Sequence, residues 1–211
     1  MRLILVDTCG PAVAVAGFVG EDCVCARAAA IVAGADGWLT PAIAECLELL
    51  GGLDVVAVSV GPGAFTGLRV GVAQAMGLAF ARGVPMRAVP SLALRAASGG
   101  DSTGTLAVID ARKGRVYAQR FRVERGVPTA LGLAADLAPE AAASLLQPGD
   151  LLVGEGAPLV AAACATPVGV VESSAEAYVR AGFPLCAWLP EVAASGLAPF
   201  YLREPDARPF G

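Results

Sequence analysis

The stretch LILVDTCGPAVAVAGF, residues 3–18, decides the fold that we predict. It opens with four apolar residues and then reaches Asp7, a pattern that is typical of a buried central strand. Gly10-Pro11 predicts a turn, and the AVAVAGF that follows predicts a second strand. Another turn leads into CVCARAAA, residues 23–30. We therefore expect three strands in an antiparallel meander at the start of the chain.

The same arrangement recurs in the second half of the chain. LAVIDARKGRVYAQRF, residues 106–121, aligns with residues 3–18 at a constant offset and without a gap. The alignment pairs Asp7 with Asp110, each at the end of an apolar strand, and both copies carry a glycine in the turn that follows. These shared features indicate a duplication in which the two aspartates face each other across a cleft.

The remaining elements complete two related halves. They are a helix from Thr40-Pro41 to Gly51-Gly52, a strand at 54–60, a helix at 67–81, a helix after Pro139, a strand at 150–157 and a helix at 173–182. We divide the chain into residues 1–100 and 101–211 and expect the tail after about residue 203 to be flexible. This order of elements resembles the duplicated ribonuclease-H-like fold of actin-like ATPases (ASKHA), so we predict an α/β fold of that class.

The composition excludes several classes of function. The sequence contains no histidine, which rules out a Ser-His-Asp relay and any metal site built on imidazole ligands, and we expect no metal site. The net charge of −4 argues against unaided binding of nucleic acid. The chain shows no secretion signal and no apolar run of about 18 residues. We therefore expect a soluble, cytoplasmic protein that does not enter a membrane.

The cysteines predict a reducing environment. There are six, none in a CxxC pair, and Cys23 and Cys25 are spaced as neighbours on one face of a strand. Buried free thiols are the interpretation that we favour over disulfides.

The glycine-rich segment GPGAFTG, residues 61–67, invites comparison with phosphate-binding loops. A Walker loop requires Lys and then Ser or Thr after its last glycine, whereas Leu68-Arg69 stands there. A dinucleotide loop has the spacing GxGxxG after the first strand, which this segment does not match. Neither kind of nucleotide loop is therefore predicted.

The helix after this loop is almost entirely apolar, since Gln74 is the only polar side chain between Val70 and Ala81. Small residues recur at every fourth position beside a row of bulky apolar ones. The small residues are Gly63, Gly67, Gly71, Ala75 and Ala79, and the bulky ones are Leu68, Val72, Met76 and Phe80. Two interpretations remain open: the helix is buried inside its own domain, or one stripe packs on the sheet and the other binds a second protein.

The segment VGPGAFTGLRVGVAQAMGLA, residues 60–79, resembles the signature of the TsaB (YeaZ) family. Three further segments agree with that family, namely LILVDT at the start, AVIDARKGRVYAQRF at the opening of the second half and PFYLR at 199–203. Together they span almost the whole chain.

The resemblance implies a non-catalytic role in making threonylcarbamoyladenosine next to the anticodon of tRNA. It implies a TsaD-like transferase subunit and a TsaE-like ATPase as partners, self-association through the same helix, and contact with tRNA only through the complex. The partner interface that we expect on this helix comprises Gly63, Gly67, Leu68, Gly71, Val72, Ala75, Met76 and Ala79.

An alternative function is a stand-alone actin-fold ATPase or kinase that uses the cleft between the halves. Asp7, Thr8 and Asp110 would then lie around ATP or ADP with magnesium. In the interpretation that we favour, the same side chains only cap turns.

One basic cluster stands out in the second half. For this cluster we favour a solvated hairpin face over a contact with tRNA or with a TsaE-like ATPase. Its members are Arg112, Lys113, Arg115, Arg120, Arg122 and Arg125.

Overall fold

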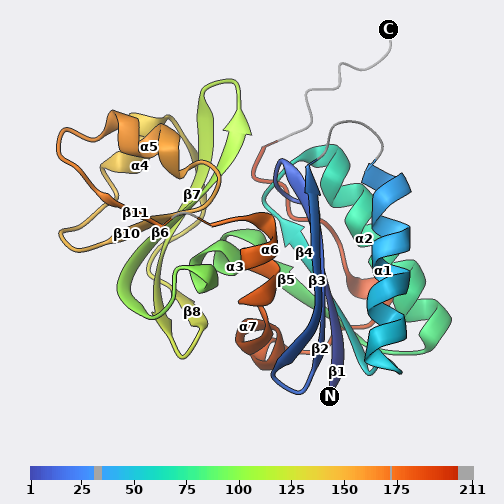
Figure 1. Cartoon of the computed structure of the whole chain (residues 1–211). Coiled ribbons are helices and arrows are strands. Elements are labelled where there is room, and N and C mark those ends of the chain that lie inside the picture. The colour runs from blue at the N-terminus through green and yellow to red at the C-terminus, as the bar shows by residue number, and fades with distance from the viewer. Residues whose placement is uncertain (31–34, 172, 204–211) are drawn as a thin grey trace, which may run out of the picture.

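The computed structural model describes residues 1–30, 35–171 and 173–203, which form two β-sheets with helices around and between them (Figure 1). The first sheet has five strands in the order β3-β2-β1-β4-β5. Its strands are β1 (Arg2–Asp7), β2 (Ala12–Val19), β3 (Asp22–Ala30), β4 (Val55–Gly61) and β5 (Met86–Pro90). The first three form the predicted antiparallel meander, and β1, β4 and β5 run parallel.

The second sheet repeats this topology. Its order is β11-β10-β6-β7-β8, and β9 also pairs with β7. The strands are β6 (Ser102–Arg112), β7 (Arg115–Glu124), β8 (Val127–Ala130), β9 (Ala135–Leu137), β10 (Leu151–Val153) and β11 (Gly169–Val171). Here too an antiparallel hairpin, β6-β7, is extended on its other side by the parallel strands β10 and β11. The predicted duplicated α/β fold is confirmed.

The helices form three layers around the two sheets (Figure 1). α1 (Ala35–Leu50) and α2 (Phe65–Arg82) cover the outer face of the first sheet, and α4 (Pro139–Ala143) and α5 (Ala157–Ala163) cover that of the second. The layer between the sheets contains α3 (Ser91–Ser98), α6 (Ala175–Arg180) and α7 (Phe183–Trp188). A short 3₁₀ turn, η1 (Ala194–Gly196), packs on α2.

The alternation of side chains along β1 and β6 corrects the gap-free alignment of the two copies. In β1 the odd-numbered Leu3 and Leu5 point into the central core, whereas in β6 the even-numbered Leu106 and Val108 point outward to α4 and α5. Residues that the alignment matched therefore lie on opposite faces, and the expectation that Asp7 and Asp110 face each other is wrong. Strands that are apolar on both faces give no indication of which side is which.

One predicted element boundary also differs from the structure. α1 begins at Ala35, so Thr40 is not its cap and the exposed Pro41 lies within it. The proposed division at residues 1–100 and 101–211 separates the two sets of strands, but α6 returns to pack on β2 and β3 of the first sheet. The expected flexible tail falls on residues 204–211, outside the described residues.

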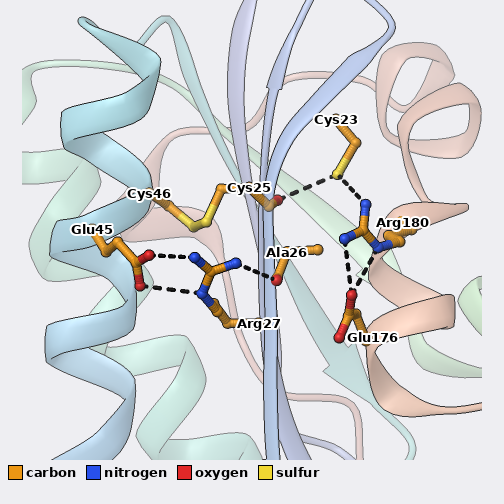
Figure 2. The surroundings of a disulfide bond; sticks show 8 residues. All are labelled: Cys23, Cys25, Ala26, Arg27, Glu45, Cys46, Glu176 and Arg180. Carbon is orange, nitrogen blue, oxygen red and sulfur yellow. Dashed lines mark hydrogen bonds and ion pairs between the residues drawn. A yellow bond between two sulfur atoms is a disulfide. The ribbon is translucent and has the colours of Figure 1, made fainter.

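A disulfide joins Cys25 of β3 to Cys46 of α1, which contradicts the prediction of free thiols throughout (Figure 2). The Cα atoms lie 5.6 Å apart, within the usual range for such a bond. A bulge in β3 opposite Gly17 and Phe18 turns Cys23 to the other face of the sheet, toward Arg180 of α6. Residues far apart in sequence meet here through tertiary packing, and their spacing gave no sign of it.

Thiol counting tests this bond. Alkylation of the denatured chain without reductant is expected to modify four cysteines, Cys9, Cys23, Cys164 and Cys186, and to modify all six after reduction. The Cys46→Ser variant is expected to lose about 3 kcal/mol of unfolding free energy, because the closed loop of 21 residues gains freedom in the unfolded chain. Six adducts before reduction would contradict the assignment.

Candidate functional site

The glycine loop and the start of α2 lie against the end of β1. The backbone N–H of Ala64 donates to the carbonyl of Cys9 at 2.8 Å. A Cβ on Gly63 would overlap the backbone of Cys9, so glycine allows the loop to approach this closely. The loop therefore makes an intramolecular contact where a nucleotide loop would be open to its ligand.

The first turns of α2 continue this close approach. The hydroxyl of Thr8 donates to the carbonyl of Gly67 at 2.8 Å. A Cβ on Gly67 would overlap the Thr8 carbonyl, and one on Gly71 would overlap the Thr8 hydroxyl. Thr8 is fully buried here, so it fixes the helix to the sheet and does not line a cleft.

This geometry corrects the partner interface that we expected on α2. Six of the eight predicted interface residues are buried within the chain: Gly67, Leu68, Gly71, Val72, Ala75 and Ala79. Only Gly63 and Met76 are half-buried. The expectation that the small-residue stripe is open for a partner is wrong. Thr8, just after β1, lies against Gly67 and Gly71, and the alanines of the stripe pack into the core on the outer face of the first sheet.

The opposite face of α2 is the one that remains open. Arg69, Ala73, Gly77 and Phe80 are exposed, and the Phe80 side chain is 86% accessible. A Cβ on Gly77 would meet nothing within 4 Å. We call this set the outer face of α2. Sequence reasoning missed it because almost every position of the helix is apolar, so the pattern did not distinguish the two sides.

The C-terminal segment covers the N-terminal end of this outer face. The N–H of Phe200 donates to the carbonyl of Val60 at 2.6 Å. The ring of Tyr201 lies 4.9 Å from that of Phe65, and Arg69 Nε donates to the Tyr201 hydroxyl at 3.3 Å. The apolar surface left open on α2 is therefore its C-terminal portion, around Phe80.

The cleft between the halves does not bring the three predicted nucleotide residues together. Its volume is ≈ 290 Å³, and its lining includes Cys9, Asp110, Lys113 and Tyr201 but neither Asp7 nor Thr8. Asp110 accepts a hydrogen bond from the N–H of Arg112 at 2.7 Å, as a turn cap does. Asp7 is completely buried, and its carboxylate lies 2.7 Å from Arg95 Nη1.

The chemistry of the cleft is limited further by its cysteine. Burial, with the nearby Asp7 charge as a second cause, raises the pKa of the Cys9 thiol well above its ordinary value. A thiol that stays protonated is a poor nucleophile. Among the residues that the structure describes, no three His, Cys, Asp or Glu side chains are grouped in a way that could hold a metal ion.

The basic cluster of the second half is largely ion-paired within the chain. Arg115 contacts Asp136 at 2.7 Å, and Arg120 contacts Asp150 at 2.6 Å. Burial alone would raise the pKa of Asp136, but hydrogen bonds from Arg203 and Arg115 outweigh it and lower that pKa. Paired guanidinium groups of this kind favour the solvated hairpin face over a nucleic-acid contact.

None of the helices in the described ranges has both the length and the apolar character that a membrane crossing requires.

Comparison with known proteins places this geometry in context. The sequence model of the family TsaD, tRNA N6-adenosine threonylcarbamoyltransferase, matches residues 36–195. An uncharacterized protein of Mycobacterium tuberculosis is 38% identical over 177 residues, which cover 81% of this chain and 76% of that protein. The tRNA threonylcarbamoyladenosine biosynthesis protein TsaB of Bacillus subtilis is 38% identical over 76 residues, 36% of this chain and 33% of that one.

A solved structure extends the similarity over nearly the whole chain. YeaZ from Pseudomonas aeruginosa superposes with a TM-score of 0.80 at 28% identity, over 95% of this chain and 99% of that one. The glycine loop and α2 therefore belong to a fold that this chain shares with YeaZ over nearly its whole length.

Two glycines of α2 offer a matched test of which face is inward. Gly71→Ala is expected to lower the unfolding free energy by about 1–3 kcal/mol, since the added methyl overlaps Thr8. Gly77→Ala, on the open side of the same helix, is expected to raise it by up to about 1 kcal/mol through helix propensity. Urea unfolding measures both. Equal changes of the same sign would contradict the assignment of the two faces.

Proposed function

Because the chain belongs to the TsaB (YeaZ) family, we propose that it is a non-catalytic subunit in the biosynthesis of threonylcarbamoyladenosine in tRNA. The Bacillus subtilis relative is a tRNA threonylcarbamoyladenosine biosynthesis protein, and this relative and the match to the TsaD family both support a place in this pathway. We propose that the chain is a partner of the transferase and not the transferase itself. The resemblance of residues 60–79 to the TsaB (YeaZ) family also implies that the partner transferase binds its metal through histidines, and this chain has no histidine.

The outer face of α2 is the observation that carries this proposal. An exposed phenylalanine forgoes about 1.5–3 kcal/mol of burial free energy, and Phe80 is 86% accessible. Beside it Ala73 and Gly77 are small enough to let another backbone come close. Small residues that surround one large exposed anchor suit helix-on-helix docking.

We propose a TsaD-like transferase as the partner that covers this face. The resemblance to the TsaB (YeaZ) family also implies self-association through this helix, so we propose that two copies of the chain pair when the transferase is absent. A TsaE-like ATPase is proposed to join the assembled pair, and tRNA to be reached only through the complex. The paired basic hairpin agrees with this, since it leaves little free positive charge for direct contact with tRNA. The cytoplasm is the location that we propose.

Two buried side chains that the alternative function would require in the cleft support the non-catalytic role. Asp7 is buried in an ion pair with Arg95, and Thr8 donates to Gly67 on α2. Neither side chain is therefore directed at the space where a nucleotide would lie. The alternative, an ATPase or kinase, would require both to move.

A charge on the outer face tests the docking surface. Phe80→Glu is expected to weaken binding to the TsaD-like transferase by about 30-fold or more, the effect of losing an interface hot spot. Isothermal titration calorimetry measures the affinity. Leu133→Glu is the matched control, because Leu133 is 92% accessible and lies far along the chain, between β8 and β9.

Both variants are expected to keep their thermal midpoints, since neither side chain contributes to a core cluster. If Phe80→Glu binds as tightly as the unmodified chain while remaining folded, the proposed surface is wrong.

Phosphate release from ATP distinguishes the alternative function. The purified chain alone, supplied with magnesium and ATP, is expected to release no phosphate above the buffer rate. Asp110→Asn serves as the probe, because Asp110 lines the cleft and the change removes its charge and its ion pair with Arg112. The amide oxygen of Asn can still accept the hydrogen bond from the N–H of Arg112 that caps the turn. Turnover by the unmodified chain that disappears in Asp110→Asn would favour the ATPase and count against the scaffold.

A further inference from the structure

A single guanidinium group connects the two halves of the molecule at their centre. Arg95 projects from α3, between the two sheets, and its side chain is 1% exposed. Nη1 lies 2.7 Å from Asp7 Oδ2, Nη2 lies 2.9 Å from Glu155 Oε1, and Nε donates to Glu155 Oε2 at 3.2 Å. All three nitrogens of the fork therefore face carboxylate oxygens.

The two carboxylates belong to different halves. Asp7 ends β1 of the first sheet, and Glu155 follows β10 of the second, just before α5. The turn after β1 approaches Glu155 so closely that a Cβ on Gly10 would overlap Glu155 Oε1. A larger residue at this position would push the Glu155 carboxylate away from its place beside Arg95.

Other groups around the fork complete its enclosure. Arg95 Cζ lies 4.7 Å from the centre of the Tyr178 ring on α6, which adds a cation–π contact. Burial and the Glu155 charge raise the pKa of Tyr178 to about 12. Burial would lower the pKa of Arg95, but Asp7 and Glu155 outweigh it and raise that pKa well above its ordinary value.

The buried carboxylate of Asp7 and the partly buried one of Glu155 would repel each other without a cation between them. An arginine suits this place because its planar fork reaches both partners at once, which a lysine ammonium does not. We propose that Arg95 is an internal counter-cation that holds the two halves in one closed orientation, so that closure of the cleft depends on no bound metal or nucleotide.

Native-state hydrogen exchange tests this proposal. The quantity compared is the ratio of the exchange rate of α3 amides to that of amides in β4 and β10. β4 lies within the first sheet and β10 within the second. Arg95→Met is expected to speed α3 exchange by at least about tenfold relative to those strands, because the halves separate before either unfolds. Arg120→Met is the matched control, since Arg120 pairs with Asp150 inside the second half and its loss leaves that ratio unchanged.

A cation provides a second readout. Millimolar magnesium chloride is expected to slow α3 exchange in Arg95→Met, where it can sit between the freed carboxylates. Sodium chloride of equal ionic strength is expected not to do so. In the unmodified chain, neither magnesium nor magnesium with ADP is expected to change α3 exchange.

Two results would overturn the proposal. One is an Arg95→Met variant whose exchange pattern matches that of Arg120→Met. The other is an unmodified chain whose α3 amides become slower with magnesium or with magnesium and ADP, since the cleft would then need a ligand to close.

If Arg95→Met does not fold, the triple variant Asp7→Asn, Arg95→Met, Glu155→Gln replaces it, because no buried charge is left unpaired. Faster relative exchange of α3 in that variant supports the proposal, and exchange equal to that of the unmodified chain overturns it.

Discussion

The close seating of α2 on the end of β1 is the contact on which the rest of the structure depends. Gly67 and Gly71 have no side chains at the point where Thr8 meets the helix, so Thr8 occupies that space. Its hydroxyl donates a hydrogen bond to the carbonyl of Gly67. This contact fixes the rotation of α2 about its own axis. With the small residues turned inward, Phe80 and Gly77 have to face solvent.

The same segment of β1 also determines what the cleft can do. Asp7 comes one residue before Thr8 and points into the central layer, where Arg95 neutralises it. One strand end therefore supplies both the anchor for α2, the helix that we propose binds the partner, and the carboxylate that Arg95 pairs with between the two halves. These contacts agree with the supporting role that we propose, since such a subunit needs a fixed surface more than a mobile catalytic cleft.

Much of the fold could be predicted from the sequence, because the hairpin whose first strand ends in Asp7, and its repeat around Asp110, contain clear strand and turn signals. The faces could not be predicted. When a strand or helix is apolar on every side, its sequence does not indicate which side faces the core. For that reason the alignment placed Asp7 opposite Asp110. For the same reason the predicted partner interface included Gly71, which is buried. The Cys25–Cys46 bond and the bridging Arg95 depend on tertiary packing between distant segments, which no local pattern encodes.

Hydroxyl-radical footprinting of the chain, free and bound to the TsaD-like transferase, tests the central claim most directly. Phe80 and Trp188 are both large and exposed, at 86% and 70%, and lie on different helices. The account predicts that the complex protects Phe80 from oxidation and leaves Trp188 as reactive as in the free chain. Unchanged oxidation of Phe80 in a fully formed complex would contradict it.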